Sequence, residues 1–166
     1  MRKPPHVIEI FLNPGEFYFG DRDIRIRTIL GSCVSITLWH PKLLIGGMCH
    51  YMLPNRQARG SKLADGKYAD EALWLLFEEI RRSGTAIEDY EVKLFGGGNM
   101  FQRLVNVGQR HIGLKNADAG RSLLKHHGLR LASEDLGGAG HRTVIFDIWS
   151  GHVWVRQLAP KCVGDD

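Results

Sequence analysis

The chain consists mainly of short apolar segments, each closed by a turn signal. The first segment, 16–29, contains alternating polar and apolar positions. The other six are five to nine residues long and lie at residues 34–39, 44–52, 91–95, 129–135, 142–149 and 152–158. Short apolar or alternating runs bounded by Gly, Pro and Ser are typical of β-strands. Ser150-Gly151 separates the last two segments and predicts a β-hairpin.

Two other segments have helical periodicity. In residues 68–82 the apolar positions recur at i, i+3, i+4, i+7, i+8 and i+11, which predicts an amphipathic helix with one buried stripe. Gly84 follows as a C-terminal stop signal. A second helix is expected at about 114–127, ending at Gly128. The order βββ, α, β, α, βββ predicts an α+β domain, a mainly antiparallel β-sandwich or folded sheet with two main helices against its outside.

Composition excludes several classes of protein. The 166 residues carry a net charge of +4, but the basic residues form no tract, so a nucleic-acid-binding stripe is not expected. No apolar run reaches the ~18 residues needed to cross a bilayer, and the N-terminal segment lacks the apolar core of a secretory signal. Three cysteines without such a signal indicate reduced thiols and a cytoplasmic location.

Cys33 is the first candidate for chemistry. It follows a break at Leu30-Gly31-Ser32 and precedes a strand. We expect Gly31 to allow a tight turn with an unusual φ, which would expose the thiol beside free backbone N–H groups. A thiol that attacks a carbonyl needs exposure and donors for the oxyanion. Gly31 and Ser32 are therefore assigned to substrate binding.

His50 lies seventeen residues after Cys33, on the third predicted strand. The strands at 34–39 and 44–52 are joined by a short turn, so pairing them as a hairpin brings the imidazole towards the thiol. A paired histidine can take the thiol proton or stabilise the thiolate.

The same residues have other interpretations. A cysteine in an apolar segment is usually a small buried hydrophobe, which is how we interpret Cys49, and Cys162 lies in a polar tail. Cys33, His40, Cys49 and His50 could be assembled as zinc ligands, but no usual zinc spacing is present. We therefore expect neither a metal nor an organic cofactor.

Several motifs in order carry a family resemblance. They are Leu30-Gly31-Ser32-Cys33-Val34, Gly46-Gly47-Met48-Cys49-His50, Met52-Leu53-Pro54, Lys67-Tyr68-Ala69-Asp70, Phe95-Gly96-Gly97-Gly98-Asn99-Met100-Phe101 and Glu134-Asp135-Leu136-Gly137-Gly138. Together they closely resemble CheD, the chemoreceptor glutamine deamidase family of bacterial chemotaxis. The resemblance implies one domain at 15–157, with an N-terminal arm at 1–14 and a polar tail at 158–166.

The resemblance also implies an activity. CheD proteins convert chemoreceptor glutamine side chains to glutamate with release of ammonia, on a fold similar to the catalytic domain of cytotoxic necrotizing factor toxins. The family's cysteine and histidine match Cys33 and His50. Its threonine stands five or six positions before the cysteine, where Thr28 is the only hydroxyl, since Arg27 occupies the sixth position. The implied role of Thr28 is to accept the other imidazole N–H, which a backbone carbonyl could also do.

The implied partners are the cytoplasmic helical regions of methyl-accepting chemotaxis receptors, with no nucleic acid and no membrane insertion. Some members of the family also bind CheC, a phosphatase of the phosphorylated response regulator. A CheC-binding regulatory module, a methylesterase and a transglutaminase therefore remain alternatives, because one Cys–His pair serves several acyl transfers.

Overall fold

The computed structural model describes residues 2–57, 63–100 and 112–159. The elements, in chain order, are β1 (Ile8–Phe11), β2 (Phe17–Gly20), β3 (Ile24–Leu30), β4 (Val34–His40), β5 (Ile45–Cys49), α1 (Ala69–Arg82), a 3₁₀ turn (Ile87–Asp89), β6 (Glu91–Gly96), α2 (Ile112–His126), β7 (Leu131–Leu136), β8 (His141–Asp147) and β9 (His152–Leu158).

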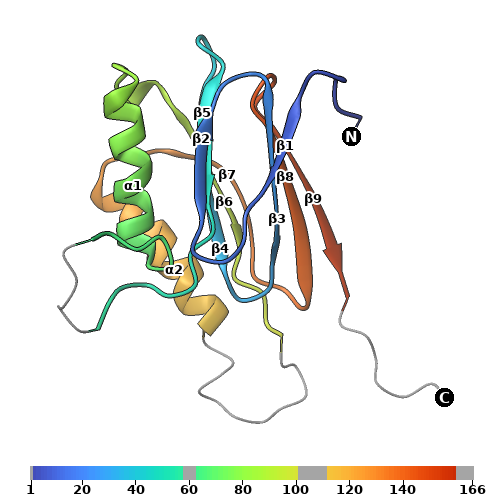
Figure 1. The fold of residues 1–166 in the computed structure, drawn as a ribbon. Coiled ribbons are helices and arrows are strands. Elements are labelled where there is room, and N and C mark those ends of the chain that lie inside the picture. The colour runs from blue at the N-terminus through green and yellow to red at the C-terminus, as the bar shows by residue number, and fades with distance from the viewer. Residues whose placement is uncertain (1, 58–62, 101–111, 160–166) are drawn as a thin grey trace.

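The strands form two facing sheets (Figure 1). Sheet A has the order β1-β3-β8-β9, and sheet B has the order β2-β5-β4-β6-β7. Neighbouring strands are antiparallel except in the pairs β1–β3 and β6–β7, which are parallel. The predicted hairpins β4–β5 and β8–β9 are present. The expected α+β class and the mainly antiparallel sandwich are confirmed.

Both helices pack on sheet B, α1 over β2 and β5 and α2 over β4 and β6. The predicted stripe of α1 is confirmed, because Ala69, Ala72, Leu73, Leu76 and Ile80 are buried. One apolar cluster fills the space between the helices and sheet B, and a second cluster fills the space between the two sheets. Within the described residues, no helix is long and apolar enough to cross a membrane.

The expectation of one strand within residues 16–29 is wrong in detail. The segment divides into β2 and β3, which lie in different sheets, and residues 21–23 connect them. Residues 31–33 make a second crossing, from β3 in sheet A to β4 in sheet B, at the lower end of the sandwich in Figure 1. Consecutive strands at these two points therefore do not pair with each other.

The segment interpreted as an N-terminal arm contains β1, which pairs with β3. Val7 and Leu12 on either side of this strand are buried, and Leu12 belongs to the cluster between the sheets. Residues 7–12 thus contribute both a strand and core side chains. Of the predicted polar tail at 158–166, Leu158 is the last residue of β9, and residues 160–166, which include Cys162, lie outside the described residues.

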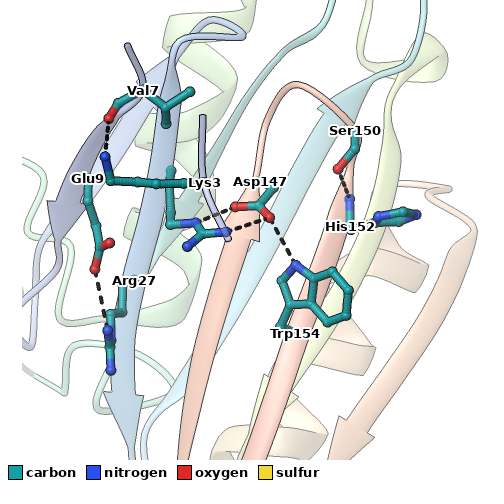
Figure 2. Close-up of polar contacts among 9 residues, drawn as sticks. Lys3, Val7, Glu9, Arg27, Asp147, Ser150, His152 and Trp154 are labelled. Atoms are coloured by element: carbon teal, nitrogen blue, oxygen red, sulfur yellow. Dashed lines mark hydrogen bonds and ion pairs between the residues drawn. The ribbon is translucent and has the colours of Figure 1, made fainter. Parts of the chain in front are cut away.

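In the described part of the chain, no helix lies over the outer face of sheet A (Figure 1). A polar cluster lies there instead. The Arg25 guanidinium donates to both oxygens of the Asp147 carboxylate, at 2.6 and 3.0 Å, and Trp154 Nε1 donates to the same carboxylate at 2.9 Å. Figure 2 shows Asp147 and Trp154 on this face, joined by the dashed line of their hydrogen bond. Arg25 and Asp147 are buried although neither α1 nor α2 covers the strands around them.

Candidate active site

Cys33 lies on the connection that crosses from sheet A to sheet B. Its side chain is half-buried, and burial raises the pKa of the thiol. The expectation about Gly31 needs correction, because Gly31 is not among the residues with positive φ. The constraint there is space, since a Cβ on Gly31 would lie 2.9 Å from Met100 Sδ.

The Gly96-Gly97-Gly98 segment holds the backbone of this connection. The Gly97 N–H donates to the Cys33 carbonyl at 2.9 Å, and the Gly98 N–H donates to the Gly31 carbonyl at 2.8 Å. A Cβ on Gly96 would lie 2.2 Å from the Cys33 carbonyl oxygen. Glycine is therefore required here by the close approach of two backbones.

The third carbonyl of the connection is held by a side chain. Asn116 Nδ2, from α2, donates to the Ser32 carbonyl at 3.0 Å. The carbonyls of Gly31, Ser32 and Cys33 all accept hydrogen bonds from the protein. In contrast, the N–H groups of Ser32 and Cys33 donate to no residue in the described part of the chain.

Strand pairing places His50 on the same face of sheet B as Cys33. Val34 and Tyr51 exchange both backbone hydrogen bonds, at 3.0 and 2.9 Å, and both side chains belong to the cluster under the helices. Cys33 and His50 each precede one member of this pair, so their side chains point to the opposite face, towards sheet A. They are diagonal neighbours across the strand pair, with a Cα separation of roughly 7–8 Å.

Thr28 reaches His50 from sheet A. Its Oγ1 lies 2.7 Å from His50 Nδ1 and 2.8 Å from the carbonyl oxygen of Leu12. A carbonyl can only accept, so the threonine hydroxyl donates to Leu12 and accepts from Nδ1–H. This arrangement fixes the neutral imidazole with its proton on Nδ1, which leaves Nε2 as a base.

Burial sets the charge state of the pair. It lowers the pKa of His50 to about 4, with the nearby Glu16 carboxylate opposing the shift, and it raises the pKa of the Cys33 thiol. Desolvation disfavours the charged form of both groups. At neutral pH the pair is therefore a thiol and a neutral imidazole, which fits a general base better than a preformed thiolate–imidazolium pair.

The neighbouring cysteine has a different environment. Cys49 is fully buried in the cluster under the helices, and burial raises its pKa to about 12. Its interpretation as a core residue is confirmed. Because Cys49 and His50 point to opposite faces of sheet B, they cannot share one metal ion. Among the described residues, no three His, Cys, Asp or Glu side chains cluster as metal ligands.

Two residues near the site were not singled out from the sequence. Asn116 is fully buried on α2, and its Nδ2 also donates to the Met52 carbonyl at 2.7 Å. Ser35, two residues after Cys33 on β4, has a buried Oγ without a partner in the described chain. A signal for the close helix contact did exist, since Gly113, Ala117 and Gly120 follow one helical stripe around Asn116.

Comparison with known proteins finds a matching family model and several similar bacterial proteins. A family model described as "CheD chemotactic sensory transduction" matches residues 52–157. A protein of Pseudomonas syringae pv. tomato, named probable chemoreceptor glutamine deamidase CheD, is 50% identical over 95% of this chain and 94% of its own length.

Similarity extends to more distant bacteria. A Dechloromonas aromatica protein named probable chemoreceptor glutamine deamidase CheD 3 is 47% identical over 92% of this chain and 89% of its own length. A Leptospira interrogans protein named CheD 1 is 43% identical over 93% of this chain and 96% of its own length. On this similarity across nearly its whole length, the chain belongs to the CheD family.

Proposed function

We propose that this protein is a protein-glutamine deamidase that converts chemoreceptor glutamine side chains to glutamate and releases ammonia, in bacterial chemotaxis. Membership of the CheD family supports chemoreceptor glutamine as the substrate, because the relatives of this chain are named probable chemoreceptor glutamine deamidases. The observation that carries the chemistry is the hydrogen bond from His50 Nδ1 to Thr28, which leaves Nε2 unprotonated on the face that bears Cys33.

In the proposed acylation, the Cys33 sulfur attacks the carboxamide carbon of the substrate while its proton passes to His50 Nε2. The N–H groups of Ser32 and Cys33 stabilise the oxyanion, because they have no other partner among the described residues. The C–N bond then breaks, and His50 gives its proton to the departing ammonia. A thioester on Cys33 remains.

In the proposed hydrolysis, water attacks the thioester carbonyl while His50 Nε2 takes one of its protons. The C–S bond breaks, the proton returns to the Cys33 sulfur, and the substrate leaves as glutamate. Thr28 keeps the imidazole oriented through both steps, because its hydroxyl accepts from Nδ1–H whether the ring is neutral or charged. These steps use only groups of this chain, the substrate and water.

The test is mass spectrometry of a purified cytoplasmic chemoreceptor fragment before and after incubation. The wild type is expected to convert particular glutamines to glutamates and to release one ammonia for each, whereas Cys33→Ala converts none. Full conversion by Cys33→Ala would contradict the assignment. Release of methanol or attachment of an amine would instead identify a methylesterase or a transglutaminase.

The same preparation tests the regulatory alternative. A wild-type protein that binds CheC tightly but releases no ammonia from any receptor fragment would be a binding module, and the deamidase proposal would fail. Ammonia release together with CheC binding would leave the deamidase proposal intact and add a partner to it.

A further inference from the structure

Asn116 joins the two halves of the candidate site. Its Nδ2 carries two hydrogens, and these go to the Ser32 carbonyl at 3.0 Å and to the Met52 carbonyl at 2.7 Å. Ser32 precedes Cys33, and Met52 lies two residues after His50. A single buried amide therefore links the backbone beside the thiol to the backbone beside the imidazole.

The orientation of this amide is fixed by its partners. Both contacted atoms are carbonyl oxygens, which only accept, so Nδ2 must face them and Oδ1 must face away. Oδ1 is buried and has no partner in the part of the chain that the structure describes. Leaving a buried acceptor unpaired is unfavourable, and such groups in native proteins call for an explanation.

Close packing of α2 brings Asn116 to this position. A Cβ on Gly113 would lie 2.5 Å from the Gly98 carbonyl, and a Cβ on Gly120 would lie 2.6 Å from Tyr51 Oη. The Tyr51 hydroxyl also donates to the Asn116 backbone carbonyl at 2.6 Å. Small residues therefore let the helix approach, and Tyr51 holds its backbone independently of the Asn116 side chain.

The consequence follows from the planarity of the peptide bond. In a trans peptide the C=O and the following N–H point in opposite directions. The bond from Asn116 draws the Ser32 carbonyl into the protein, so the Cys33 N–H points away from α2. In the same way the bond from Gly98 holds the Gly31 carbonyl, so the Ser32 N–H is oriented too.

We propose that Asn116 is a positioning residue of the deamidation reaction, which fixes the Cys33 N–H as an oxyanion donor by holding the Ser32 carbonyl. This inference rests on the proposed function. In this role Asn116 helps to stabilise the tetrahedral intermediate and does not activate the Cys33 thiol.

Two variants test the proposal, Asn116→Leu, which keeps the number and branching of the side-chain heavy atoms, and Asn116→Ala. Loss of an oriented oxyanion donor is expected to lower kcat for receptor deamidation by about 100-fold or more. KM should change little, because the interaction forms only in the transition state. Tyr51→Phe is the matched control: it loosens α2, lowers Tm to a similar degree and leaves kcat near the wild-type value.

Alkylation of Cys33 by iodoacetamide separates this role from a general structural one. The reaction displaces iodide at a saturated carbon and forms no oxyanion, so its rate should be the same in wild type and both Asn116 variants. Wild-type kcat in Asn116→Leu would overturn the inference. A parallel fall of kcat and alkylation rate, or an equal fall of kcat in Tyr51→Phe, would also overturn it.

Failure of this inference is distinguishable from failure of the proposed function. A wild-type enzyme that releases no ammonia removes the deamidase assignment itself. An active wild type with equally active Asn116 variants removes only the role of Asn116.

Discussion

The two faces of β3 carry polar clusters that are built differently. On the outer face, Arg25 and Asp147 form a buried two-point ion pair, and Trp154 donates a third hydrogen bond to the carboxylate. Figure 2 shows the hydrogen bond from Trp154 to Asp147. Every oxygen of this carboxylate has a donor, as a buried charge requires.

On the inner face, the cluster around His50 contains polar atoms that have no hydrogen-bond partner among the described residues. Thr28 satisfies Nδ1, but Nε2 makes no hydrogen bond to a described residue. The Ser35 hydroxyl, opposite His50 across the Val34–Tyr51 pair, is also buried without a partner among the described residues. Unpaired buried groups cost stability, and a cluster that served only the fold would pair them.

The difference suggests how to separate structural from functional polar groups in this fold. Substitutions on the outer face should change stability and spare catalysis. Substitutions on the inner face should change catalysis by more than they change stability.

The largest expected effect is that of His50→Gln. Glutamine can fill much of the space of the imidazole, but it cannot take the thiol proton, so kcat for receptor deamidation should fall at least ~10³-fold. Ammonia release measures the loss, and thermal unfolding monitors the fold. A His50→Gln protein with more than a tenth of the wild-type kcat would contradict the general-base role.

The next effect belongs to the outer face. Asp147→Ala leaves the Arg25 guanidinium buried without its carboxylate, and breaking such a pair costs about 3–5 kcal/mol of unfolding free energy. Urea unfolding measures the loss. The kcat of the folded fraction at low temperature should remain near wild type, and a large fall would show that the two faces are not independent.

Thr28→Val should have a smaller effect on rate. The hydroxyl accepts from Nδ1–H, and a hydrogen bond to a charged group contributes about 1.5–3 kcal/mol, so kcat should fall roughly 10- to 150-fold as the imidazolium forms. Thr28→Ser keeps the hydroxyl and should restore most of the rate. Equal activity of the Val and Ser variants would show that Thr28 does not orient the ring.

The smallest effect, taken per pH unit, is the slope of stability with pH. The pKa of His50 is about 4 in the folded protein and ~6.5 when unfolded, so the unfolded state binds the extra proton between these values. The free energy of unfolding should therefore decrease as pH falls from ~6.5 to 4, by up to about 1.4 kcal/mol per unit. His50→Gln lacks this contribution, and identical slopes for the two proteins would mean that His50 is not buried as a neutral ring.

Local patterns in the sequence were enough to predict much of the fold. The stripe of α1, the hairpin at Ser150-Gly151 and the strand pair that carries His50 all follow from periodicity and turn residues. The parallel pairs β1–β3 and β6–β7 did not follow, because their partners are separated along the chain and each register depends on tertiary packing. The crossings at 21–23 and 31–33 were missed because a turn signal does not show whether the next strand stays in the same sheet.

The residues of the candidate site also differ in whether local patterns in the sequence predict them. Cys33 and His50 were predicted from a turn and a hairpin, which are local features. No local feature predicts Asn116, because the carbonyls that accept its hydrogen bonds belong to Ser32 and Met52, which lie 84 and 64 positions away in the sequence. An asparagine in a helix otherwise looks like a solvent-facing residue, and only the packing of α2 brings it to the cysteine.

Capture of the acyl-enzyme is a direct test of covalent catalysis by Cys33. Wild-type protein and receptor fragment are mixed, quenched in acid within a turnover and digested, and the Cys33 peptide is analysed by mass spectrometry. We expect a thioester that joins the Cys33 sulfur to the side-chain carbonyl of a receptor glutamine, with one ammonia released for each bond formed. Deamidation in which no such adduct forms, or one in which the adduct lies on Cys49 or Cys162, would contradict it.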